Sequence, residues 1–205
     1  GAQGGKVAST IACRAFEEEA RRLLQKEEGE QPPLSDVVTG AAQAANRAVY
    51  ESARQDAHLM GMGTTLVCLL TDGKQAVVGN IGDSRAYLID GDGLRQVTSD
   101  HSLVAEMVRR GELSPGEARH HPNKNVITRA LGVEQSVSCD VFPLTPGKGQ
   151  FVLLCSDGLT NEVSEPEIYY EVFQSQEPEK ACDTLIDIAK DRGGRDNITV
   201  LLASF

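Results

Sequence analysis

The 205-residue sequence lacks long apolar runs and paired cysteine motifs. No apolar stretch approaches the ~18 residues that a membrane-spanning helix needs, and the N-terminus lacks the basic and apolar zones of a signal peptide. The five cysteines are odd in number and scattered, with no Cys-x-x-Cys pair for zinc or redox chemistry. We therefore expect a cytoplasmic domain with no membrane span, whose cysteines are reduced residues of the core.

Clustered positive charge is also missing. The chain has 20 Lys and Arg against 30 Asp and Glu, a formal net charge of -10. A protein that binds nucleic acid without sequence preference needs clustered Lys and Arg to neutralise phosphates, so no nucleic-acid partner is expected. An acidic protein that acts on phosphate groups would more plausibly do so through metal ions.

The chain is long enough for one globular domain, which we place over residues 1–205. Apolar residues recur at helical spacing over 6–26, before a loop over 27–33, and again over 34–55, where Ser35 or Asp36 is the expected N-cap. Further helices are expected over 164–174 and 177–193, a polar helical segment over 100–121, and an irregular segment over 122–132.

Short β-prone runs separated by Gly-containing turns over 63–98 predict antiparallel hairpins. Strands are also expected over 136–144, 149–156 and 197–205. Helices that flank antiparallel strands indicate an α+β layered domain with two stacked sheets.

Four turns next to strands contain an aspartate. They are GDSR (82–85), TSDH (98–101), CSDGL (155–159) and GGRDN (193–197). Taken alone, each is more readily explained as a turn former than as a metal ligand. However, Asp157 follows an apolar strand and Asp196 precedes one, so both carboxylates would lie at the edge of the core. A lone charge is costly there and a metal ion would neutralise it; Mg²⁺ and Mn²⁺ prefer such oxygen ligands.

Five ordered segments carry a resemblance to a known family. They are GTTLVCLL (63–70), NIGDSRAYLI (80–89), the run from TSDH to RALG (98–132), LLCSDGLTNEV (153–163) and GGRDNITVLL (193–202). In order and spacing they resemble the motifs of the metal-dependent serine/threonine protein phosphatases of the protein phosphatase 2C type, and most of all the bacterial members. The resemblance implies a four-layer α-β-β-α sandwich of two antiparallel sheets, with Mg²⁺ or Mn²⁺ ions at one end.

The same resemblance implies roles for individual residues. Asp157 and Asp196 match ligands of a metal pair that activates the attacking water, and Asp100 matches a ligand of a third, weaker ion. Asp83 is expected to stabilise its turn rather than to bind metal. The implied activity is hydrolysis of phosphoserine and phosphothreonine in proteins of bacterial signalling by a monomer, and the implied partner is a cognate kinase whose action it opposes.

The segment from about 100 to 132 resembles the family's flap, a mobile segment beside the cleft that touches the substrate protein. Within it, His120 and His121 are expected to be solvated surface residues rather than bases or ligands. Asn197 and His101 are candidates for hydrogen-bonding groups that orient ligating carboxylates.

The expected chemistry needs no covalent nucleophile. A carboxylate-held metal pair roughly 3.5–4 Å apart lowers the pKa of bound water and shields the phosphoryl oxygens. None of the five cysteines lies in a Gly-rich anion cradle followed by arginine, which agrees with a water nucleophile.

The start of the chain departs from the family pattern. An Arg-x-x-Asn-(Glu/Gln)-Asp strand and an Asp-Gly pair with a metal-bridging aspartate are absent, and Ala2 occupies the place where relatives often carry a histidine. Either the N-terminal strands lie outside this chain or the domain has no complete metal pair; we expect the first. As it stands, the chain is then expected to bind at most one ion well and to have weak activity.

The alternative function is a catalytically impaired phosphatase-like domain that binds and regulates phosphoproteins or kinase partners. Hydrolysis of a chromogenic phosphate ester with and without Mn²⁺ separates the two.

Overall fold

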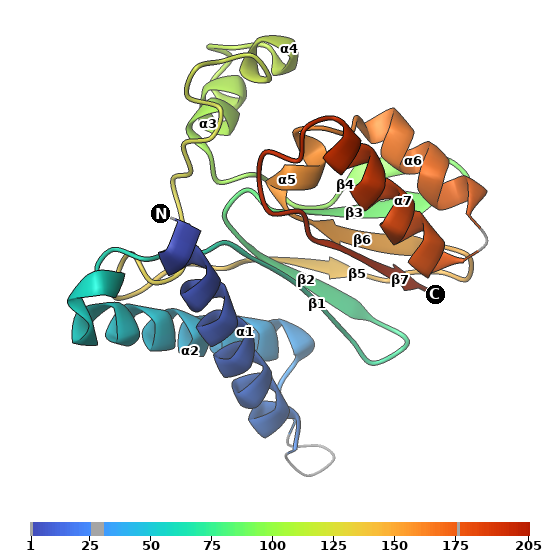
Figure 1. The fold of residues 1–205 in the computed structure, drawn as a ribbon. Helices are drawn as coiled ribbons and strands as arrows, with labels where there is room; N and C mark the ends of the chain where they lie inside the picture. Colours follow the sequence, from blue (N-terminus) through green and yellow to red (C-terminus); the bar gives the residue numbers. More distant parts are fainter. Residues whose placement is uncertain (1, 26–30, 176) are drawn as a thin grey trace.

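Two antiparallel sheets stack face to face between pairs of helices in the computed structural model (Figure 1). The structure describes residues 2–25, 31–175 and 177–205. The strands are β1 (Leu66–Thr71), β2 (Ala76–Ile81), β3 (Arg85–Asp90), β4 (Gly93–Gln96), β5 (Asp140–Leu144), β6 (Phe151–Cys155) and β7 (Val200–Ser204). The helices are α1 (Ala2–Leu24), α2 (Leu34–Gln55), η1 (Ala57–Leu59), α3 (Leu103–Arg109), α4 (Pro115–Ala118), α5 (Asp157–Thr160), α6 (Glu165–Gln174) and α7 (Pro178–Asp191). The predicted α+β sandwich is confirmed.

The strand order is β1-β2-β5 in one sheet and β4-β3-β6-β7 in the other. The two hairpins predicted over 63–98 are β1-β2 and β3-β4, and the chain changes sheet between them. It does so at Gly82, whose φ is 107° and where a Cβ atom would collide with the side chain of Thr65. Glycine is therefore needed at the crossing, which brings the following residues to one end of the sandwich.

Three apolar layers hold the sandwich together. Val78 and Val152 lie in the layer between the sheets. Leu153 and Cys155, on the other face of β6, pack against α6 and α7, while α1 and α2 cover the outer face of β1 and β2. Because both faces of the central strands are buried, their sequences are continuously apolar rather than alternating.

The first two helices differ in detail from the prediction. Helix α1 begins at Ala2, earlier than expected, and includes Gly4, whose missing side chain allows close approach to Met62. The predicted N-cap of α2 was wrong: Pro33 is the N-cap, and Asp36 lies in the first turn, where its charge favours the positive end of the helix dipole. Lys26 and most of the loop predicted over 27–33 lie outside the described residues.

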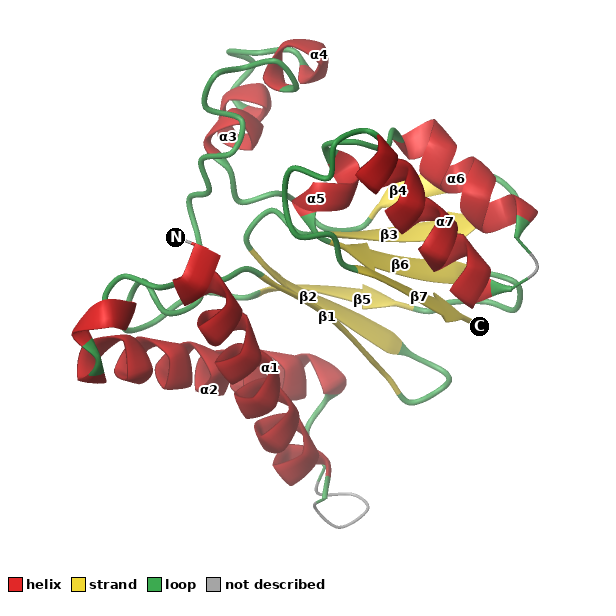
Figure 2. Cartoon of the chain, in the orientation of Figure 1, coloured by secondary structure: helices red, strands yellow, loops and turns green. Residues whose placement is uncertain are grey.

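Residues 100–132, which we call the flap, form two short helices instead of one helical segment. Ser102 caps α3, and Ser114 caps α4 in a reciprocal box with Glu117. Gly111, with φ 73°, separates the two helices. Figure 2 shows the flap projecting from the body on loops. An isolated β-bridge between Ser102 and Ile127 holds the two ends of its projecting part together.

All five cysteines are free; Cys155 is buried, but Cys13 is exposed, contrary to its expected place in the core. No described helix is long and apolar enough to cross a membrane.

Candidate functional site

A cleft of about 990 Å³ separates the flap from the segment that contains α5 and the start of α6. Three aspartates line its floor: Asp83, Asp100 and Asp157. Each lies in a different turn at the same end of the sandwich. Strands β2 and β6 both end there, and the segment that follows β4 returns to that end. The sheet geometry therefore gathers carboxylates that lie far apart in sequence.

The turns around Asp157 and Asp196 are bound directly to each other. The hydroxyl of Ser156 donates to the carbonyl of Asn197 at 3.0 Å and accepts from the backbone N–H of Thr199 at 3.0 Å. A Cβ atom at Gly158 would collide with the carbonyl of Asn197. A larger residue after Asp157 would therefore push the two turns apart.

This contact joins the turn of Asp196 to that of Asp157, although Asp196 itself is not among the residues that line the cleft. Burial raises the pKa of the Asp157 carboxyl, and the negative charge of Asp196 raises it further. Asn161 donates to Asp157 Oδ2 at 3.2 Å. Asp196 is exposed and accepts from the backbone N–H of Asn197 at 2.7 Å. Asn197 thus orients this carboxylate through its backbone.

Asp83 has an environment that the prediction of a simple turn former did not anticipate. Burial raises its pKa to about 6, and the charges of Asp157 and Asp100 contribute to the shift. The sequence did contain a signal, since Asp83 follows the fully buried strand β2 much as Asp157 follows β6. We add Asp83 to the group of carboxylates that line the cleft.

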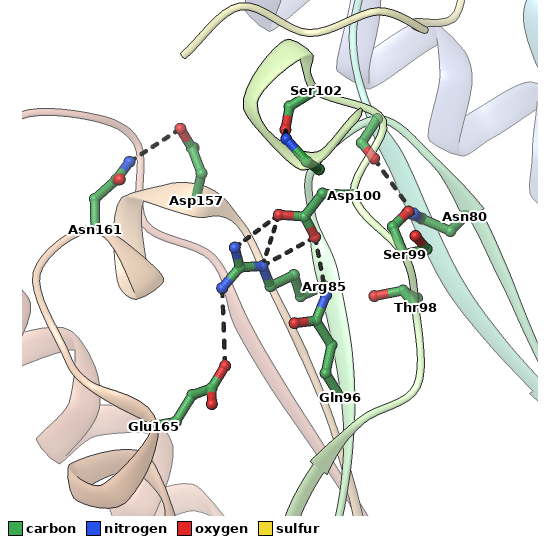
Figure 3. Close-up of polar contacts among 12 residues, drawn as sticks. Asn80, Arg85, Gln96, Thr98, Ser99, Asp100, Ser102, Asp157, Asn161 and Glu165 are labelled. Atoms are coloured by element: carbon green, nitrogen blue, oxygen red, sulfur yellow. Dashed lines mark hydrogen bonds and ion pairs between the residues drawn. The ribbon is translucent and has the colours of Figure 1, made fainter. Parts of the chain in front are cut away.

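Asp100 is held by a cation of the chain itself. Arg85 donates to its two oxygens from Nε at 3.0 Å and from Nη2 at 2.6 Å, and Gln96 donates to Oδ1 at 2.9 Å (Figure 3). Burial lowers the pKa of Arg85, but its hydrogen bonds and charge interactions with Asp100 and Tyr87 together outweigh burial and raise it. Both oxygens of Asp100 are occupied, so a metal ion at this residue would compete with Arg85.

Arg85 is a site residue that sequence reasoning missed. Its Nη1 donates to the hydroxyl of Tyr87 at 3.2 Å and lies 4.0 Å from Glu165 at the start of α6. Arg85 therefore connects the floor of the cleft to the α6 wall (Figure 3). A basic residue in the GDSR turn was visible in the sequence, but its distant partners were not.

His101 does not orient a candidate metal ligand, contrary to the prediction. Its Nδ1 accepts from the backbone N–H of Gly82 at 3.0 Å, so Nε2 carries the proton and donates to Asp140 Oδ2 at 3.0 Å. Arg129 donates to the other oxygen of Asp140 at 2.6 Å. This buried histidine ties the sheet crossing to β5 and, through Arg129, to the returning end of the flap.

The two flap histidines differ in position. His120 is exposed, lines the cleft and has Nδ1 3.2 Å from the carbonyl of Gly116. His121 is half-buried, and its Nδ1 accepts from the backbone N–H of Asn123 at 3.1 Å. Both bonds are local to the flap, which favours the predicted surface role.

The floor of the cleft suits a hard divalent cation. Burial raises the pKa values of Asp83 and Asp157, and repulsion by neighbouring carboxylates adds to both shifts; a cation would relieve that repulsion. Within the described residues no group of three or more His, Cys, Asp or Glu side chains is arranged to hold a metal ion. Mg²⁺ is commonly held by only one or two carboxylates and keeps several waters, so the pair formed by Asp157 and Asp196 fits such an ion.

Comparisons with known proteins agree with this arrangement. Residues 1–188 match the family model described as protein phosphatase 2C. The chain is 43% identical over 205 residues to the serine/threonine phosphatase stp of Listeria innocua, covering 98% of this chain and 79% of that protein. It is 42% identical over 159 residues to the protein phosphatase PhpP of Streptococcus pneumoniae, covering 78% of this chain and 64% of that protein.

Solved structures show the same fold. The serine/threonine phosphatase PstP/Ppp of Mycobacterium tuberculosis superposes with a TM-score of 0.88 at 34% identity, covering 98% of this chain and 83% of that chain. A catalytic domain of PstP in complex with two manganese ions gives a TM-score of 0.85 at 32% identity, covering 98% of this chain and 81% of that chain. The chain therefore belongs to the protein phosphatase 2C family of protein serine/threonine phosphatases, whose cofactors are Mg²⁺ and Mn²⁺.

Proposed function

We propose that this chain hydrolyses phosphoserine and phosphothreonine in proteins at the cleft floor, with Asp157 and Asp196 as ligands of Mg²⁺ or Mn²⁺. The observation that supports this assignment is the direct bonding of their two turns through Ser156, which brings the segments that carry the two carboxylates into contact. When bound, the metal supplies charge neutralisation at the phosphoryl oxygens and activates water.

The chain's own residues then have separate tasks. Asn161 fixes Asp157 Oδ2, and the backbone N–H of Asn197 fixes Asp196 Oδ1, so both carboxylates are oriented before an ion arrives. Arg85 is bound to Asp100 and is therefore not free to contact phosphate. Asp100 stands as the candidate ligand for a weaker ion, in competition with that arginine.

Four finer features belong to the same proposal. Residues 1–205 act as one domain and as a monomer, the flap over 100–132 contacts the substrate protein, and the phosphate groups removed are those added by a cognate serine/threonine kinase. The cleft of about 990 Å³ between the flap and the start of α6 supports the contact between flap and substrate, because residues of both segments line it.

The test compares Asp157→Asn and Asp196→Asn with Asp92→Asn, an exposed aspartate of the β3-β4 turn. With Mn²⁺ and a phosphothreonine peptide, the first two variants should lose at least about a hundredfold in turnover, the upper end of what loss of an orienting partner alone costs. Calorimetry should show weakened Mn²⁺ binding in both. The Asp92 variant should match the parent protein.

Turnover retained in Asp157→Asn would contradict the ligand assignment. A parent protein that binds phosphopeptides without hydrolysing them, even in Mn²⁺, would instead favour a regulatory binding domain.

A further inference from the structure

On the projecting part of the flap, residues 103–126, the charged side chains that line the cleft differ in sign from many of those that do not. The cations of this segment that line the cleft are Arg109, Arg119 and Lys124, with His120 between them. The acidic residues of the same segment are Glu106, Glu112 and Glu117, and none of them lines the cleft. Residues 103–126 therefore present only positively charged side chains to the cleft, while Asp100, at the start of the flap, belongs to the cleft floor.

These cleft-facing cations have no carboxylate partner within the described residues. Arg119 and Lys124 are exposed and take part in no ion pair there. Arg109 donates to two neutral acceptors, the hydroxyl of Ser99 at 3.1 Å and the carbonyl of Asp100 at 3.3 Å.

Two other charged residues of this segment, Arg110 and Glu117, have local partners within the flap. Arg110, next to Arg109, lies 3.9 Å from Glu106 and does not line the cleft. Glu117 is used by the hydroxyl and N–H of Ser114. Free positive charge on the flap is thus concentrated where a substrate would lie.

The opposite wall has the reverse sign and is only partly neutralised. Glu167 lies 2.6 Å from Arg192, and Glu165 lies 4.0 Å from Arg85, whereas Glu162 forms no ion pair within the described residues. A segment placed in the cleft would therefore meet unpaired cations mainly on its flap side. The body, in a chain of net charge -10, would repel acidic segments elsewhere.

We propose that the flap selects phosphoprotein segments with acidic side chains beside the phosphorylated residue, through Arg119 and Lys124. This rests on the proposed function, because it takes the cleft as the place where the phosphoprotein binds. Pairs formed at such exposed cations are individually weak and sensitive to salt, so the selection is a modest bias that depends on several charges acting together.

The test uses two labelled phosphothreonine peptides that differ only in flanking residues, Asp in one and Asn in the other. The parent protein should show a kcat/KM ratio of about tenfold in favour of the Asp peptide at low salt, falling towards one as NaCl is added. Arg119→Gln combined with Lys124→Gln should bring this ratio close to one. Arg119→Glu with Lys124→Glu should invert it.

Arg110→Gln is the control, because it removes one positive charge from the same segment away from the cleft; its ratio should equal the parent's. Affinities of both peptides, measured by fluorescence anisotropy in EDTA, give a second readout that needs no turnover and should show the same preference. Absence of hydrolysis of either peptide in Mn²⁺ would count against the proposed function, and the anisotropy ratio would still decide the selection. Equal affinities in the parent, or a preference that survives the double substitution, would overturn the inference.

Discussion

Asp83, Asp100 and Asp157 share one cleft, yet their surroundings differ sharply. Asp100 is paired with Arg85, whereas Asp83 and Asp157 are partly buried and have raised pKa values. The three residues come from similar turns. Only the folded structure determines which of them pairs with the guanidinium of Arg85. In the absence of metal, the chain therefore carries an electrostatic cost at the place where metal is expected.

Asp83→Asn should reveal that cost as a dependence of stability on pH. The pKa of Asp83 is raised from 3.8 to about 6 in the fold. The folded state therefore takes up a proton before the unfolded state does, and the destabilisation caused by the ionised carboxylate disappears as the pH falls through that range. In EDTA, the asparagine variant should be more stable than the parent by about 1–2 kcal/mol near neutral pH.

Thermal unfolding of both proteins across this pH range measures the difference. It should shrink towards zero as the pH approaches the ordinary value of 3.8. A stability difference that does not change with pH would show that the ionised Asp83 carboxylate does not destabilise the parent protein.

Arg85→Gln should expose the competition for Asp100. The variant loses a partly buried ion pair, so we expect about 2 kcal/mol lower stability in EDTA, less than for a fully buried pair. Adding Mn²⁺ should raise its melting temperature more than that of the parent, because the freed carboxylate becomes available to a cation.

Arg95→Gln, on the neighbouring strand β4, is the control, since Arg95 is exposed and forms no ion pair in the described structure. Equal melting-temperature gains in Arg85→Gln and in the parent would mean that Asp100 does not meet the ion.

At the scale of elements, the sheet crossing at Gly82 decides where the site forms. It separates two hairpins into two sheets, and the N–H of Gly82 donates to Nδ1 of His101. Gly82→Ala combines an unfavourable φ with a collision against Thr65, and should cost about 2 kcal/mol or more.

Gly91→Ala is the comparison, because a Cβ atom there has no neighbour within 4 Å. Urea unfolding of both variants measures the effect, and Gly91→Ala should remain within about 0.5 kcal/mol of the parent. Similar losses in the two variants would remove the special role assigned to the crossing.

Prediction from sequence succeeded where the pattern is local. Helical spacing identified α2 and α7, and apolar runs bounded by turns identified β2 and β6. The single helical segment expected over 100–121 was wrong, because Ser114 with Pro115 starts a second helix after Gly111. The N-cap serine, the proline after it and the glycine between the helices are strong local signals, but the helical spacing of apolar residues alone does not reveal them.

At the scale of the whole molecule, the site depends on contacts between distant segments, and here the sequence was less informative. The pairing of Arg85 with Asp100 and of His101 with Asp140 depends on how two sheets stack, which no local pattern specifies. The family resemblance supplied the architecture and the candidate ligands, but the metal roles of Asp100, Asp157 and Asp196 remain predictions. The distribution of charge around the cleft became visible only after the flap was placed opposite α6.

The two ends of the flap are joined by backbone hydrogen bonds, and this affects how such a protein can change during evolution. Its projecting part leaves and rejoins the body where Ser102 pairs with Ile127, and the N–H of Thr128 returns to the carbonyl of His101 at 2.8 Å. Because the loop closes there, residues can be inserted, deleted or exchanged beyond it at little cost to the sandwich. New protein substrates can then be gained by changing the flap alone, while the residues at the catalytic end of the sandwich stay the same.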